Sequence, residues 1–300
     1  MRVNPNQLPD ILAALNQSQT TLNTALQQVS TGKSVSQPSD NPYASAAMVQ
    51  NTVETANVDQ YTQNVSSVLS MVQTADSSLS SVVSSLTQAV TLGTEGANGT
   101  TSSANMSAIA TQVQGLLQSV VQQANSSYNG AYLFGGTENS EAPYTADSSS
   151  STGYTYNGNS GVNSVIIGDD QSVQVNLPGS QIFSDSTNSV IGSLSSLVSA
   201  LQSGDSSAIQ SATTAVSSAL NYVSQQRVFY GNAESQLNAQ STFLSSETVQ
   251  LSSQATSLSG VDMAQAATTL AQAEATNSAA LAAVAKVIPT SLLNYLPTTT

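Results

Sequence analysis

The 300-residue chain contains no cysteine, no histidine and no tryptophan, and only four of its residues are basic. Zinc sites built on cysteine or histidine, cysteine nucleophiles, Ser-His-Asp triads and disulfide frameworks all need residues that are absent. Four cations spread along the chain do not form the basic patch that nucleic-acid binding requires. These absences predict a protein that is not an enzyme, that uses no cofactor or metal, and that does not bind nucleic acid.

Charge is scarce throughout, since only 7% of the residues are charged and the formal net charge is −13. An uncharged polar surface favours close packing against identical copies, because like charges then rarely meet. No run of 18 apolar residues occurs, so we expect no membrane insertion. Residues 1–30 contain no apolar block of signal-peptide length, and we expect any secretion to proceed without a cleaved leader.

Apolar residues recur every seven positions over most of the chain, and this spacing predicts long amphipathic helices. The first helix should end at Gly32, and Pro38 and Pro42 should separate it from the next, with Asn41 as the cap. Gly260 should separate the last two helices, and Pro289 should end the last one. The first predicted helix has about 24 residues, with Asn6 as its possible cap and Pro9 in its first turn. The others are about 42–91, 102–128, 188–202, 206–259 and 261–288.

Three long rows carry this prediction. In the second helix the first row is Val58, Val65, Val72, Leu79 and Leu86, and the second row is Tyr61, Val68, Ala75, Val82 and Ala89. In the helix from residue 206 the row comprises Ile209, Val216, Val223, Tyr230, Leu237, Leu244, Leu251 and Leu258. Both helices are expected to pack together as the core of a helical rod.

Residues 130–187 differ from the rest, because short β-like runs and turn signals such as Asn157-Gly158 replace the helical spacing. We expect a small β-rich domain with a flexible serine tract at 148–151. An aromatic cluster should form its core, although the same residues leave a carbohydrate-binding patch open as an alternative. The cluster comprises Tyr132, Phe134, Tyr144, Tyr154 and Tyr156.

The predicted fold is mainly α: a long coiled-coil-like helical rod with its N- and C-terminal helices paired and a small β-rich domain inserted. Five segments follow from the breaks. They are 1–41 (N-terminal assembly helix and linker), 42–129 (N-terminal half of the rod), 130–187 (outer β-rich domain), 188–259 (C-terminal half of the rod) and 260–300 (C-terminal assembly helix).

The two terminal helices are too short to fold alone, because isolated helices are marginal in water and ordering the backbone costs about 1–2 kcal/mol per residue. We therefore expect residues 1–40 and 260–300 to be disordered in the free monomer and to order on assembly. The apolar residues predicted to form the assembly interface are Leu8, Ile11, Leu12, Leu15, Leu22, Leu26, Val29, Met263, Leu270, Leu281, Val284, Ile288, Leu292, Leu293 and Leu296.

Two short motifs invite a functional interpretation that we do not favour. Gly32-Lys33-Ser34 matches the end of a phosphate-binding loop, but Gln27 stands where that loop needs glycine and a helix precedes it. Asp169-Asp170 could suggest a calcium or acid–base site, but EF-hand spacing is absent. We expect a helix C-terminus at the first motif and a polar turn at the second.

Several segments together resemble the bacterial flagellin family. They are Ser30-Thr31-Gly32-Lys33, Gln37-Pro38-Ser39-Asp40-Asn41-Pro42, Ala97-Asn98-Gly99-Thr100, Ala131-Tyr132-Leu133-Phe134-Gly135-Gly136-Thr137 with Pro143-Tyr144, Arg227 with Gly231-Asn232-Ala233, and Ser291-Leu292-Leu293-Asn294-Tyr295-Leu296. The fourth and last of these are more similar to the members that join hook to filament. The resemblance extends over almost the whole chain and is weakest at about 138–160.

The resemblance implies a structural role in the bacterial flagellum and in motility. The chain would be exported through the flagellar type III apparatus and would lie outside the cell at the hook–filament junction. Its implied partners are other copies of itself in a ring, flagellin, the other junction protein, and an export chaperone on the C-terminal helix. The terminal helices would form the inner tube, and the β-rich domain would face outward.

Two other functions remain open from the sequence. The first is a filament-forming flagellin, which abundance along the filament would distinguish from a junction protein. The second is a secreted helical translocator or adhesin, which would act on membranes or glycans and would be revealed by liposome leakage or glycan binding.

Overall fold

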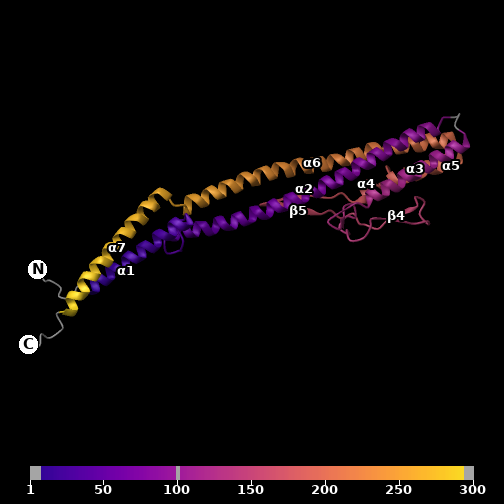
Figure 1. Cartoon of the computed structure of the whole chain (residues 1–300). Coiled ribbons are helices and arrows are strands. Elements are labelled where there is room, and N and C mark those ends of the chain that lie inside the picture. Colours follow the sequence, from indigo (N-terminus) through magenta and orange to yellow (C-terminus); the bar gives the residue numbers. More distant parts are fainter. Residues whose placement is uncertain (1–7, 99–101, 294–300) are drawn as a thin grey trace, which may run out of the picture. The chain divides into compact units, whose positions relative to one another are not determined.

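The computed structural model describes residues 8–98 and 102–293 (Figure 1). The chain forms two compact units. One holds the described residues up to Ala56 and from Thr248 onward, and the other holds Asn57–Glu247. The helices are α1 (Leu8–Thr31), α2 (Pro42–Gly96), α3 (Ser103–Ala124), α4 (Gly179–Ile182), α5 (Val190–Ser203), α6 (Ser206–Ser259) and α7 (Met263–Leu293).

The break between α1 and α2 forms as the prolines predict. Gly32 follows α1 with a φ of +67°, a backbone conformation that glycine adopts without strain. The Asp40 carboxylate then accepts hydrogen bonds from the backbone N–H groups of Gln37 and Ser36, both at 2.9 Å, and these bonds lower the pKa of Asp40. The Asn41 side chain accepts the N–H of Ala44 at 3.1 Å, so it caps α2 as expected.

In the second unit, α2 and α6 run antiparallel and bury the predicted rows of the two helices against each other. Every residue of the rows within this unit is buried except Tyr61, which is half-buried. Two polar contacts cross the pair: a bidentate Arg227–Asp76 ion pair at 2.8 Å, and a bond from Gln73 to Glu234 at 3.0 Å. The heptad spacing therefore predicted both the helices and their common core.

Three predicted helix limits are wrong. Helix α2 passes through Gly93 and continues to Gly96. Glycine at position 93 allows the close approach of α6, because a Cβ there would collide with the side chain of Thr213. Helix α3 ends at Ala124 instead of 128, since the Asn125 side chain bonds both the N–H and the C=O of Tyr144 at 2.8 Å. Helix α7 continues past Pro289 to Leu293.

The small domain between α3 and α5 contains three two-stranded antiparallel ladders and the short helix α4, and the ladders do not join into one sheet. Strands β1 and β3 and helix α4 were not predicted, and the residues of β1 were expected to be helical. The strands are β1 (Ser127–Tyr128), β2 (Ala131–Tyr132), β3 (Tyr144–Ala146), β4 (Tyr154–Tyr156), β5 (Ser164–Gly168) and β6 (Gln171–Gln174).

Aromatic rings form the core of this domain. Phe134 packs edge-on against Phe183 with ring centroids 5.3 Å apart, and Tyr144 lies 5.9 Å from Phe183 and 5.1 Å from Tyr156. The predicted cluster is thus confirmed for Phe134, Tyr144 and Tyr156. Tyr132 and Tyr154 are half-buried and take no part in these ring pairs.

The predicted serine tract at 148–151 is a turn organised by Asp147. The carboxylate of Asp147 accepts hydrogen bonds from the hydroxyls of Ser149 and Thr155 and from the backbone N–H of Ser149. These bonds stabilise the charged form and lower the pKa of Asp147 to about 2. The turn joins β3 to β4.

The β5–β6 hairpin is bonded to both long helices of the second unit. Tyr61 donates to Asp169 at 2.9 Å, Asn64 donates to the carbonyl of Ile166 at 2.8 Å, and Gln240 donates to that of Ile167 at 3.0 Å. Asp169 and Asp170 form the turn of this hairpin, which confirms the structural interpretation of that motif. No group of three or more metal-ligating side chains occurs among the described residues.

Candidate assembly interface

In the first unit, α1 and α7 lie side by side along their length (Figure 1, indigo and yellow). The breaks that follow α1 and precede α7 are joined. Ser34 donates its backbone N–H to the carbonyl of Ser259 at 2.7 Å, and Val261 donates to the carbonyl of Gly32 at 3.1 Å. Lys33 lies opposite Gly260 in this bridge, so Gly32-Lys33-Ser34 is a helix end, as expected, and pairs with the other break.

Small residues occupy the fully buried positions between α1 and α7. Among the residues of these helices whose exposure is described, those buried are Ser18, Ala25, Ala266 and Ala273, and none has a side chain larger than serine. Small side chains let two helix backbones approach closely, but they remove little apolar surface from water. The pairing of the terminal helices is therefore confirmed. Its fully buried positions are small, and the larger apolar side chains along the pair are at most half-buried.

The predicted interface residues remain partly exposed in this pair, to different degrees. Leu12, Leu26, Met263 and Leu281 are 45–50% exposed. The half-buried residues are Ile11, Leu15, Leu22, Val29, Leu270 and Val284. Leu8 begins α1, and Ile288, Leu292 and Leu293 lie in the last turns of α7, while Leu296 lies outside the described residues. The pair thus leaves large apolar side chains available to a further partner.

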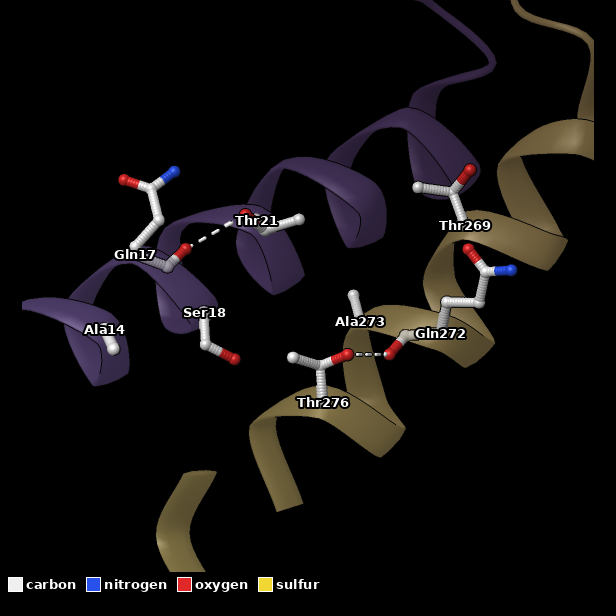
Figure 2. A pocket seen from close by; sticks show the side chains of 8 residues that line it. All are labelled: Ala14, Gln17, Ser18, Thr21, Thr269, Gln272, Ala273 and Thr276. Carbon is white, nitrogen blue, oxygen red and sulfur yellow. Dashed lines mark hydrogen bonds between the residues drawn. The ribbon is translucent and has the colours of Figure 1, made fainter. Parts of the chain in front are cut away.

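A groove of about 400 Å³ lies between the two helices (Figure 2), and we call it the α1–α7 groove. Its lining carries no charge, and each helix contributes residues at the spacing i, i+3, i+4 and i+7, which places them on one face. The sequence analysis missed this face, because its side chains are small or polar and give no apolar row. The lining residues are Ala14, Gln17, Ser18 and Thr21 with Thr269, Gln272, Ala273 and Thr276.

The weak contact between α1 and α7 leads to a prediction for the free monomer. Since small side chains bury little apolar area, the pair should open easily, and amide hydrogens of α1 and α7 should exchange at least 100-fold faster than those of α2 in the second unit. Hydrogen–deuterium exchange read by mass spectrometry measures both. Equal protection of the terminal helices and the α2 core would contradict the expected disorder of the free ends.

No helix in residues 8–98 or 102–293 combines the length and the apolar character needed to cross a bilayer. The terminal helices also hold few charges, since Asp10 is the only charged residue in α1. The arrangement therefore offers an uncharged, partly apolar helical surface, which is suited to helix–helix packing between chains.

The chain is similar to known flagellar proteins. It is 30% identical over 176 residues to flagellar hook-associated protein 3 of Salmonella typhimurium, covering 55% of this chain and 51% of that protein. It is 33% identical over 132 residues to flagellar hook-associated protein 3 of Escherichia coli, covering 40% of this chain and 38% of that protein. The matched regions thus span about half or less of these curated relatives.

Solved structures share the fold. The crystal structure of Bacillus cereus FlgL matches with a TM-score of 0.61 at 23% identity, over 69% of this chain and 99% of the other. That of the flagellar junction protein FlgL from Legionella pneumophila matches with a TM-score of 0.60 at 14% identity, over 71% and 100%. At these identities the likeness concerns the fold alone.

Family models match both ends of the chain. Residues 7–139 match the N-terminal helical region of bacterial flagellin, and residues 213–296 match its C-terminal helical region. Together these matches cover more than two thirds of the chain and include both terminal helices and most of α2 and α6. The chain belongs to the bacterial flagellin family.

Proposed function

We propose that this chain is a structural component of the bacterial flagellum, a junction protein that links the hook to the filament by helical self-assembly. The observation that carries the proposal is the surface of the α1–α7 pair. The two helices pack with small residues at their fully buried positions and leave Leu12, Leu26, Met263 and Leu281 about half exposed. Such side chains need a partner, and a family built from copies of one chain supplies it.

The partners of this junction would be neighbouring copies in a ring, flagellin on one side and the other junction protein on the other. The chain would reach the cell exterior through the flagellar type III apparatus without a cleaved leader, and a chaperone would cover the C-terminal helix before export. The small buried residues of the terminal pair support this route. Export requires an unfolded chain, and a pair that buries little apolar area needs little free energy to open.

A filament-forming flagellin is the second candidate, since the family models describe flagellin itself. The names of both curated relatives favour the junction instead. Copy number separates the two: a flagellin would be present along the whole filament, and a junction protein only in a short zone at the end of the hook.

A strain that lacks this chain tests the proposal. We expect hooks without filaments, flagellin released into the medium, and loss of swimming, because filament subunits would have no surface to assemble on. Restoring the gene should restore filaments, and immunogold labelling should mark the hook end alone. Filaments that persist in the deletion strain, or label along their length, would refute the junction function.

A further inference from the structure

We propose that the α1–α7 groove is an uncharged hydrogen-bonding site that takes side-chain amides from α1 of a second copy of this chain. The proposal rests on the self-assembly proposed above and adds the chemistry of one contact within it. It predicts that the copies meet partly through polar bonds in this groove, besides contacts of the exposed leucines.

The threonines of the groove have already used their donors. Thr21 donates its hydroxyl to the carbonyl of Gln17 at 2.9 Å, and Thr276 donates to that of Gln272 at 2.8 Å (Figure 2). Thr269 does the same to Gln265 at 2.9 Å. A hydroxyl carries one donor and two acceptor lone pairs, so what these threonines still offer to the groove is acceptor capacity. A side chain bound there can donate to these threonines, while the amides of Gln17 and Gln272 and the hydroxyl of Ser18 add donors to the lining.

Ser18 independently shows that the site is incomplete. Its side chain is only 8% exposed, and its Oγ is buried without any hydrogen-bond partner. In Figure 2 the hydroxyl points from α1 into the space between the two helices. Buried hydroxyls are almost always paired, because an unpaired one loses its bonds to water without replacement. An amide in the groove could pair with Ser18 and with a threonine acceptor at once.

The charge distribution favours a second copy as the occupant. With a net charge of −13, two copies repel each other wherever their acidic side chains meet. The groove carries no charge, α1 contains only Asp10, and α7 contains only Glu274 between residues 263 and 285. Charge repulsion between copies is therefore small at this site.

The same helix carries suitable donors. Asn16, Gln19 and Asn23 of α1 are exposed, and within the described part of the chain their side-chain amides make no hydrogen bond. An amide NH₂ has two donors, which match the threonine acceptors of the groove and its one free hydroxyl. A neighbouring α1 would thus bring the required groups on an uncharged surface.

Replacing Ser18 by alanine tests the site, because the change should have opposite effects on the monomer and on its self-association. In the monomer, S18A removes an unpaired buried hydroxyl, so the helix content of α1 and α7 should stay unchanged or rise. In the assembly the variant loses a bond, so its self-association constant, measured by analytical ultracentrifugation of the full chain, should weaken about 5- to 10-fold. Ser126 also has a buried, unpaired Oγ but lies in the second unit, and S126A should leave self-association unchanged.

Cross-linking locates the occupant, because the chain has no cysteine and each single variant carries one thiol. Mixed A14C and N23C copies, treated with a short bis-maleimide under assembly conditions, should yield cross-linked dimers several-fold above A13C mixed with N23C. Ala13 is the matched control, being exposed on α1 but outside the groove. The pairs A14C with N16C and A14C with Q19C test the other two proposed donor positions in the same way.

Each contrary result overturns the groove proposal. Self-association that is unchanged or strengthened in S18A would do so, as would equal cross-linking of A14C and A13C in all pairs, or cross-linking of A14C only to another protein such as flagellin or a chaperone. The junction function is judged separately by the deletion strain. A motile S18A strain, together with a motile A14C strain whose thiol stays freely reactive in assembled flagella, would end this inference and leave the junction function intact.

Discussion

A triple variant with Leu12, Leu26 and Leu281 changed to glutamine is expected to abolish filament attachment and swimming. These side chains are 45–48% exposed in the chain, so about half of each remains to be buried by a partner. Full burial of a leucine is worth about 1.5–3 kcal/mol, so three half-burials contribute about 2–4 kcal/mol per subunit, and their loss weakens assembly roughly 30- to 700-fold. Motility and immunogold counts at hook ends measure the loss.

The control is a second triple variant, with Ile166, Val228 and Phe243 changed to glutamine. These residues are 58–59% exposed, somewhat more than the three leucines, but lie in the second unit. We expect this variant to be secreted and incorporated at near-normal levels. The far-ultraviolet circular dichroism of both monomers should match that of the parent chain, because exposed positions contribute little to folding. Normal incorporation of the first variant, or equal loss in both, would show that the terminal helices are not the assembly surface.

The helices of the second unit could be predicted because their packing follows a simple repeat. Val72, Leu79 and Leu86 are fully buried, and so are Val223 and Leu237 on the facing helix. Large apolar side chains seven residues apart have few ways to leave water other than along a shared helical seam. The breaks at Pro42 and Gly260 were predictable for a similar reason, since proline and glycine restrict or release the backbone locally.

The contact between the terminal helices could not be predicted in the same way. Its fully buried positions are Ser18, Ala25, Ala266 and Ala273, which differ little in hydrophobicity from the alanines and serines around them. The strong apolar pattern of α1 instead marks the residues that the fold leaves partly exposed. A row of large residues therefore indicates that a surface will be buried, but not whether the same chain or another one buries it.

The sequence predicted a small domain with short strands and an aromatic core, but not its strand limits, helix α4 or the place of Phe183 in the core. Its ladders have two to five residues per strand, too few for a two-residue alternation to identify them. Phe183, which joins Phe134 and Tyr144 in the core, follows α4 and lies far from the predicted cluster in sequence. Long-range side-chain bonds such as those of Asn125 to Tyr144 set the end of α3 and have no local signal.

Changing Tyr230 to alanine is expected to cost about 3–5 kcal/mol of unfolding free energy in the second unit, as large-to-small changes at buried aromatic positions do. Tyr230 is 1% exposed, packs edge-on against Phe229 at 5.2 Å, and accepts the backbone N–H of Leu177 at 3.3 Å. It therefore links the row of α6 to the end of the small domain. Urea denaturation followed by circular dichroism measures the loss, and a change below about 1 kcal/mol would contradict this role.

Tyr230→Phe separates the ring from the hydroxyl. This variant keeps the packing and leaves the Leu177 N–H unpaired, so it should cost about 1–3 kcal/mol of unfolding free energy.

Burial also raises the pKa of Tyr230, because the charged phenolate is disfavoured away from water. The folded chain thus keeps the phenol neutral while the unfolded chain ionises it near its ordinary pKa of about 10, and stability should fall as pH rises above that value. Phenylalanine cannot ionise, so the variant should lose less stability than the parent between pH 9 and about pH 11.5. Parallel losses would show that Tyr230 is ionised in the folded chain and that the buried phenol does not contribute to alkaline unfolding.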